Sequence, residues 1–471
     1  MPDVSKAIMI NVHRDMNPKE RPLKFLLSFA IVLLVVASVY VLTYGSPYFS
    51  IFLISAAVYL WGIGREATAR GRFDRLTHTA FQTWFNVGLI LGLVMWLHAG
   101  TWVPTGDSVK DREMRPRADF MMFYGSALVL QNSATQLYDQ NRQAAAQRLA
   151  TGLEISESDI DFLPFPYPAV VALAFVPLTF FAYHTAYLIM ILINFTMLGI
   201  IVWILSTGMN LEREETQVLV LCLTASLPVY AVLVEGQVSF FSLLFYALAI
   251  TDLRKGHSRR AGIWAGLLAF KPTLVPALFF WFAVRRQWQA LGWAVLVAGA
   301  MAMLSILLVG IDGSLGYIDI SLKMAQEHYY TGRSSSMPNL RGIVGLWGGG
   351  MFAWSAAIGL VFGALAFFKH KGPQTEWDHC ALVMATILAA PHLLIQELVL
   401  TLIVIALVLA RLKGHVTAAW RWLLLLLMGL PAVYFDWPGV QEPQAAVIAY
   451  VILPIFLLFG FQSLAGPPEI A

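Results

Sequence analysis

The chain of 471 residues has little charge: acidic and basic residues make up 13% of it, and hydrophobic residues make up 58%. A soluble protein carries roughly 25% charged residues, so the composition excludes an ordinary soluble enzyme. Many apolar runs have the length of about 20 residues that spans a bilayer core, and mean hydropathy is +0.69. The alternating pattern of an outer-membrane barrel is missing. We therefore expect an all-α polytopic membrane protein.

Other absences limit the chemistry. The only cysteines, Cys222 and Cys380, both lie in apolar runs, so neither a disulfide framework nor a cysteine metal cluster is expected. The chain contains no HExxH, CxxC or GxSxG motif and no Walker glycine loop. Its basic stretches are short, and no nucleic-acid partner is expected. The first apolar run starts near Leu23, is too long for a signal peptide and has no cleavage site after it.

Basic residues predict the orientation. Residues 1–22 are polar and basic, and a second basic group lies between Arg65 and Arg75, after two apolar runs. The positive-inside rule places both in the cytoplasm, so the next span runs outward. We expect about 12–14 transmembrane segments in the plasma (inner) membrane, with both termini cytoplasmic. Two long extracytoplasmic loops are expected, at about 101–167 and 310–340.

The predicted domains are a cytoplasmic N-terminus with an accessory helix pair, 1–63, and a transmembrane catalytic domain, 64–471. The loop at 101–167 is expected to carry helices outside the bilayer or along its interface. Residues 217–234 and 342–368 are each expected to form a single span.

Asp119 stands between a polar loop and the apolar run that begins at Phe120. Aspartate is favoured as the N-cap of a helix, which is one interpretation. The other is a general base that takes a proton from an acceptor hydroxyl, with neighbouring apolar residues keeping the carboxylate basic.

Lys271 lies in the middle of an apolar run flanked on both sides by basic residues. A lysine at a transmembrane helix centre costs about 2.5–3.5 kcal/mol on insertion scales. Its side chain either extends to an interface or binds a phosphate. Because both flanks are basic, we expect a broken helical hairpin with Lys271-Pro272 at its turn.

Further polar residues have two interpretations each. Glu235-Gly236-Gln237 is either a plain turn using glycine for positive φ or a turn that faces a sugar or phosphate. In the second outer loop, arginines suit phosphate recognition, although solvation alone also explains them. His392, Gln396 and Glu397 form either the outer turn of a hairpin or part of a site. The outer-loop residues concerned are His328, Arg333, Asn339 and Arg341.

Five motifs then occur in a characteristic order across about residues 80–410. They are Asp119-Phe120 with Leu137-Tyr138-Asp139, Phe165-Pro166-Tyr167-Pro168 with Val176-Pro177-Leu178, Glu235-Gly236-Gln237, Ala261-Gly262 through Lys271-Pro272, and Asn339-Leu340-Arg341-Gly342. The set resembles the GT-C glycosyltransferases, specifically glycosyltransferase family 87, the polyprenol-phosphate-mannose-dependent mannosyltransferase-like group.

The resemblance implies a GT-C fold and an enzyme whose active site faces the extracytoplasmic or periplasmic side. It would transfer mannose or another monosaccharide from a polyprenyl phosphate to a glycolipid or cell-envelope glycan, with inversion and without a metal or cofactor. Asp119 would be the catalytic base. The candidates for donor and phosphate binding are Lys271, Arg333, Arg341 and His328. The substrate-site candidates are Glu235, Gln237, Asn339, Tyr167, Gln396 and Glu397.

The chain departs from the family at two places. The tryptophan and paired histidines usual near Gln396-Glu397 are missing, which leaves mannose itself open. The usual asparagine two residues after the turn's glutamine is Ser239. A transporter or flippase of lipid-linked sugars is the alternative, because it too would have many spans and a broken helix. The two large loops on one face and the lack of an internal repeat favour the enzyme.

Overall fold

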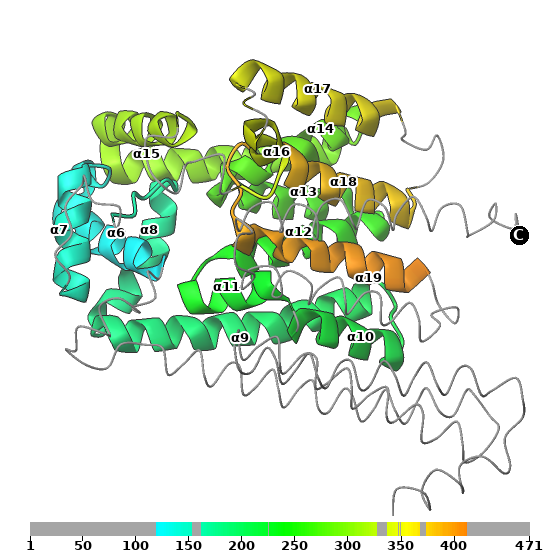
Figure 1. The fold of residues 1–471 in the computed structure, drawn as a ribbon, viewed down its shortest axis with the longest axis horizontal. Coiled ribbons are helices and arrows are strands. Elements are labelled where there is room, and N and C mark those ends of the chain that lie inside the picture. The colour runs from blue at the N-terminus through cyan, green and yellow to red at the C-terminus, as the bar shows by residue number, and fades with distance from the viewer. Residues whose placement is uncertain are drawn as a thin grey trace, which may run out of the picture. The chain divides into compact units, whose positions relative to one another are not determined.

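A computed structural model of the chain describes most of the region from Asp119 to Arg411. The described ranges are 119–152, 162–224, 226–326, 337–346, 348, 350–367 and 374–411. The chain divides into two compact units, and every described residue lies in the unit formed by 96–435 and 439–471. All regular elements in these ranges are helices (Figure 1), as the all-α prediction requires. The accessory helix pair at 1–63 and the predicted spans after 411 lie outside the described residues.

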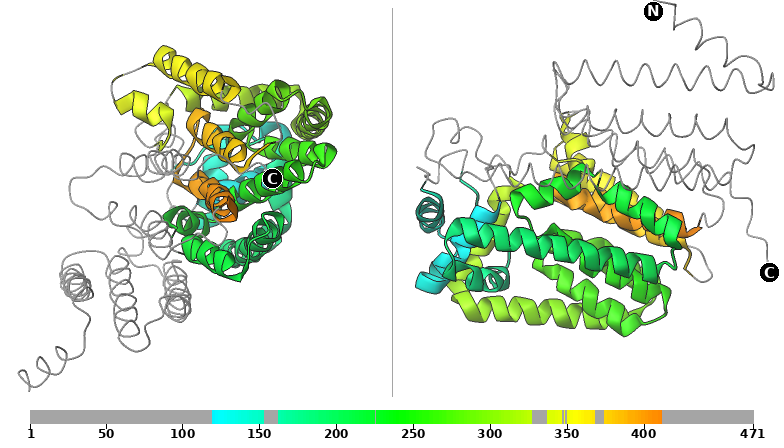
Figure 2. Two further views of the ribbon diagram at one scale, coloured as in Figure 1. Left: turned by 90° about the vertical axis from the view of Figure 1, so that its right-hand side faces the viewer. Right: turned by 90° about the horizontal axis from the view of Figure 1, so that it is seen from below.

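The first predicted outer loop carries a small aromatic core. Its helices α6, α7 and α8 pack together at one end of the long helix α9 (Figures 1 and 2). Phe120 and Phe123 of α6 are fully buried, and the Phe123 ring stacks on Phe175 with 4.8 Å between centroids. This packing fixes the start of α6, directly after Asp119. The elements are α6 Phe120–Ser133, η1 Ala134–Gln136, α7 Gln140–Thr151, α8 Ala169–Phe175, η2 Val176–Phe180 and α9 Tyr183–Gly208.

In the described part of the chain, two helices are long and apolar enough to cross a bilayer, α9 and α15 (Trp288–Ala325). Their outer faces carry large exposed apolar side chains, such as Trp203, which is 66% exposed, and Leu307, which is 74% exposed. Soluble proteins rarely expose contiguous apolar surface of this extent, whereas a lipid-facing helix requires it. The described part therefore fits an all-α membrane protein.

The expected single span at 217–234 is instead two helices. They are α10 Arg213–Thr224 and α11 Leu227–Glu235. Pro228 lies in the first turn of α11, where its missing N–H is tolerated, whereas within a continuous helix it would interrupt the ladder. The prediction of one unbroken span was wrong for this reason. Helix α12, Ser239–Arg254, follows directly.

The expected broken hairpin is present between α12 and α15. A Cβ on Gly262 would meet Ala290, and one on Gly266 would meet Ala294, so α13 and α15 run in the same direction in close contact. Helix α14, which connects α13 to α15 in the chain, must therefore run in the opposite direction to both. Lys271 stands at the break, with φ −127° and ψ 78°. The elements are α13 Ser258–Leu267, η3 Leu268–Phe270, η4 Pro272–Leu274 and α14 Pro276–Val284.

The second outer region differs from the prediction in two ways. Helix α15 continues to Ala325, past a break at Gly310 with φ 72°, so the start of the expected loop 310–340 is helical. The expected span 342–368 is divided into α16, Leu340–Leu346, and α17, Met351–Phe367. Gly348 between them has φ 70°, a left-handed conformation that a helix cannot contain.

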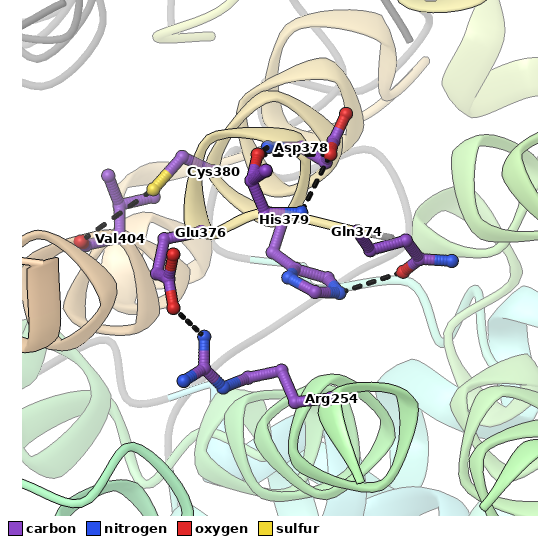
Figure 3. Close-up of polar contacts among 8 residues, drawn as sticks. Arg254, Gln374, Glu376, Asp378, His379, Cys380 and Val404 are labelled. Atoms are coloured by element: carbon purple, nitrogen blue, oxygen red, sulfur yellow. Dashed lines mark hydrogen bonds and ion pairs between the residues drawn. The ribbon is translucent and has the colours of Figure 1, made fainter. Parts of the chain in front are cut away.

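The last described elements are α18 Glu376–Ala389, η7 Ile395–Leu400 and α19 Thr401–Arg411. A capping box of Thr375 and Asp378 begins α18. At the same end, Arg254 of α12 donates to Glu376 at 2.8 Å, as Figure 3 shows. This ion pair joins α18 to α12. The other end of α18 leads into residues 390–394, which form the link to η7 and part of the site.

Candidate functional site

A cavity of about 340 Å³ lies where the start of α6, the break at Lys271, the end of α15 and the link 390–394 meet. The volume falls in the range of small-molecule sites. Most of the polar residues singled out in the sequence reach its wall, although they come from distant segments. These residues are Asp119, Tyr167, Gln237, Lys271, Arg341, Gln396 and Glu397.

Asp119 does not use its side chain as a helix cap. It precedes α6, but its carboxylate makes no capping hydrogen bond. Instead the side-chain amides of Gln237 and Gln396 both donate to the same oxygen, Oδ2, the second at 3.2 Å. Among the described residues no hydrogen bond is made to Oδ1. One carboxylate oxygen is therefore held in place, and the other is available at the cavity wall.

The turn Glu235-Gly236-Gln237 brings Gln237 to the carboxylate. Gly236 has φ 61°, and a Cβ there would lie 2.8 Å from Cβ of Phe120. Glycine is required both by this conformation and by the close approach. The amide oxygen of Gln237 accepts from the N–H of Val238 at 3.1 Å, so its NH₂ group must face Asp119.

Glu235 lies behind Asp119 and is not among the residues that line the cavity. Its Oε2 accepts a hydrogen bond from the main-chain N–H of Asp119 at 3.2 Å. This contact anchors the backbone that carries the carboxylate. The structure therefore gives Glu235 a positioning contact, and its contact with substrate stays a prediction.

Desolvation by the surrounding protein raises the pKa of Asp119 to about 6; the nearby Glu397 adds to this, and Gln237 and Lys271 oppose it. Desolvation also raises the pKa of Glu235 to about 8, with a further contribution from the Asp119 charge. Burial and mutual repulsion therefore disfavour two negative charges on this pair, and Asp119 is the member that lines the cavity. The pair thus has one carboxylate that can accept a proton and faces the cavity.

Lys271 does not extend to an interface, because it is 6% exposed and its ammonium donates to Oε1 of Glu397. The ammonium also lies 5.5 Å from the centre of the Tyr167 ring. Glu397 accepts two more hydrogen bonds, from Oγ of Ser239 at 2.8 Å and from the N–H of Leu394 at 2.9 Å. A buried ion pair needs such additional partners. The network holds the segment that presents Gln396.

Asn339 and Arg341 fix the link 390–394. The amide of Asn339 donates to the carbonyl of Ala390 at 2.7 Å, and its oxygen accepts from the N–H of Arg341 at 3.0 Å. The guanidinium of Arg341 donates to the carbonyls of Pro391 and Ala325, each at 2.7 Å. Arg341 lines the cavity, whereas Asn339 is behind it. His328 and Arg333 lie outside the described residues.

The cavity wall has further polar residues outside the predicted site set. They are Thr273, Tyr317, Ser321 and His392, of which only His392 had been noted in the sequence, beside Gln396 and Glu397. Thr273 follows the break at Lys271-Pro272, and His392 belongs to the link. The sequence signal for Thr273 was its position two residues after an intramembrane lysine. The signal for His392 was a histidine at the end of an apolar run.

Comparison with known proteins identifies the family. Residues 165–395 match the sequence model of glycosyltransferase family 87. No curated protein and no solved structure matches the chain. The matched segment contains Tyr167, Gln237, Lys271 and Arg341, and Asp119 lies before it. The family predicted from the sequence motifs is thus confirmed over residues 165–395, which match the family 87 model.

Proposed function

We propose that the protein transfers a sugar from a polyprenyl-phosphate donor to a hydroxyl group of a glycolipid or cell-envelope glycan, with inversion. The observation that carries the proposal is the carboxylate of Asp119, which is at the cavity wall and is held through one oxygen by two amides. The fold would be of the GT-C type. The acceptor hydroxyl would lie next to Oδ1, the oxygen that Gln237 and Gln396 leave open.

In this reaction Asp119 takes the proton of the acceptor hydroxyl as its oxygen attacks the anomeric carbon of the sugar. The bond from that carbon to the phosphate oxygen breaks, and the polyprenyl phosphate leaves as an anion. Fixed cations near the leaving oxygen stabilise this charge. Arg341 and Lys271 both line the cavity and are the two candidates for this role. No metal or cofactor is required by this scheme.

The exposed apolar faces of α9 and α15 support a location in the plasma (inner) membrane. The distribution of basic residues supports an active site on the extracytoplasmic face and cytoplasmic termini. Lipid solubility of the donor agrees with a cavity whose wall also contains Met122, Pro276 and Met324.

The test is transfer by the purified full-length protein in detergent, with a labelled polyprenyl-phosphate sugar. Asp119→Asn should fold normally and lose transfer, because the amide cannot accept the proton. Asp319→Asn is the matched control, since Asp319 is exposed and forms a surface ion pair with Lys323. Transfer needs no sealed membrane, so activity in detergent also distinguishes the enzyme from a flippase. Wild-type turnover by Asp119→Asn would contradict the proposal.

A further inference from the structure

Two residues of the cavity wall, Thr273 and His392, each carry a buried polar atom without a hydrogen-bond partner among the described residues. The atoms are the hydroxyl oxygen of Thr273 and Nδ1 of His392. Buried polar atoms in proteins are nearly always hydrogen-bonded. Other unpartnered buried atoms occur in the described part of the chain, for example on Thr251 and His379, but none of those residues lines the cavity. The two unpartnered atoms of cavity residues therefore indicate a polar group that binds in the cavity and hydrogen-bonds to them.

The same wall carries a guanidinium. Arg341 donates to the carbonyl of Pro391 at 2.7 Å, which places it beside His392. His392 is also within electrostatic range of Lys271 and Glu397, and Thr273 follows Lys271-Pro272 in the chain. A hydroxyl, an imidazole and a guanidinium all donate hydrogen bonds to oxyanions, and arginine matches phosphate through its forked geometry.

We propose that Thr273, His392 and Arg341 form the binding site for the phosphate group of the lipid-phosphate donor. The assignment rests on the proposed function, and it adds two residues that the sequence motifs did not indicate. It also separates the two ends of the reaction: Gln237 and Gln396 hold the base, whereas these three side chains hold the leaving group. Lys271 then acts mainly through its pair with Glu397, which fixes the segment that presents Gln396.

The test is the affinity of the full-length protein in detergent for farnesyl phosphate, with farnesol and inorganic phosphate as the other two probes. The wild-type protein should bind farnesyl phosphate more tightly than either. Thr273→Val and His392→Leu should each weaken that affinity by about tenfold or more, as loss of a hydrogen bond to a charged group does. His392→Asn, which keeps a donor near the position of Nδ1, should recover part of the loss.

Thr251→Val and His379→Leu are the matched controls. Each removes an unpartnered buried atom away from the cavity, and Figure 3 shows His379 bonded through its other ring nitrogen to Gln374. Both should bind farnesyl phosphate as the wild type does.

The site would be overturned if Thr273→Val and His392→Leu both bound farnesyl phosphate with wild-type affinity. It would also be overturned if these two variants lost affinity for farnesol as much as for farnesyl phosphate. A wild-type protein that bound farnesol as tightly as farnesyl phosphate would have the same consequence. Asp119→Asn separates this proposal from the proposed function. It should bind farnesyl phosphate normally without transferring a sugar. If it transfers at the wild-type rate, the catalytic assignment fails and the phosphate site is still decided by the binding data.

Discussion

Two aspartates of the described region are surrounded by hydrogen-bond donors, and they differ in what is left open. Asp252 in α12 is 2% exposed. It accepts a hydrogen bond from Trp264 at 2.9 Å, forms an ion pair with Arg260 at 3.2 Å and contacts Nδ1 of His257 at 3.2 Å, so both of its oxygens are engaged. Asp119 receives both side-chain amides on one oxygen and faces a cavity with the other. A saturated carboxylate stabilises the fold, whereas a half-saturated one at a cavity wall can accept a proton.

The surroundings of the two acids differ in the same way. The donors around Asp252 come from nearby residues of the chain, and the Trp264 ring stacks on Phe245 of the same helix as the acid. The donors around Asp119 come from positions 118 and 277 residues away. Local contacts build the first cluster, and the packing of the whole helical unit builds the second.

The largest expected effect on stability is at the ion pair beside Asp119. Lys271→Met leaves the carboxylate of Glu397 buried and unpaired, and should lower the free energy of unfolding by about 3–5 kcal/mol. The double variant Lys271→Met with Glu397→Leu should be more stable than the single one, because no buried charge is left alone. Thermal unfolding in one detergent measures both. Equal loss in the single and double variants would show that the charge pairing is unimportant.

The next effect concerns the turn that carries Gln237. Gly236→Ala forces a side chain into the left-handed region and against Phe120, with a cost of about 1–3 kcal/mol. Because Phe120 is next to Asp119, transfer should fall by more than the loss of stability explains. Gly256→Ala is the control: Gly256 also has positive φ, but a Cβ there meets no neighbouring atom. Similar activity in both variants would argue against the close approach as the cause.

A smaller effect tests the amides that hold the base. Asp119 must be ionised to accept a proton, so transfer should fall as the pH drops through its pKa of about 6. Gln396→Met removes a donor that stabilises the ionised carboxylate, which raises the pKa of Asp119. The acid limb of the pH–rate profile should then move to higher pH. An upward shift of about one unit from a pKa of about 6 lowers activity at pH 6 about fivefold. A uniform loss of rate at every pH would indicate a merely structural role.

The smallest expected effect on transfer is at Asp252. Asp252→Asn weakens the contacts with Arg260 and Trp264 and should lower the free energy of unfolding by about 1–3 kcal/mol. The folded fraction should keep its rate of transfer and its pH profile. Loss of turnover without loss of stability would remove the distinction between the two aspartates.

Much of the fold followed from local signals. Low charge and long apolar runs indicated helices in a membrane, the flanking basic residues indicated a hairpin broken at Lys271-Pro272, and Gly236 indicated the turn. The errors at 217–234 and 342–368 also had local causes, Pro228 and Gly348, which the apolar character of those runs outweighed.

The site was only partly predictable, because its geometry depends on contacts between distant segments. The sequence indicated Asp119, Gln237 and Gln396 as separate candidates, but nothing local places two amides on one oxygen. Likewise, Gln396 and Glu397 are adjacent in the chain but make different contacts. Glu397 pairs with Lys271, and Gln396 donates to Asp119. Glu235 and Asn339, two of the substrate-site candidates, form hydrogen bonds with the backbone of Asp119 and Ala390 that the sequence did not indicate.

The most direct measurement is the rate of sugar transfer by Asp119→Asn and Asp252→Asn, purified side by side in detergent with a labelled polyprenyl-phosphate sugar. The account predicts that Asp119→Asn binds farnesyl phosphate normally and loses transfer by a factor of about 10²–10⁴, the contribution of a general base. It predicts that Asp252→Asn unfolds at a lower temperature and transfers at the wild-type rate. Transfer at the wild-type rate by Asp119→Asn would contradict the account.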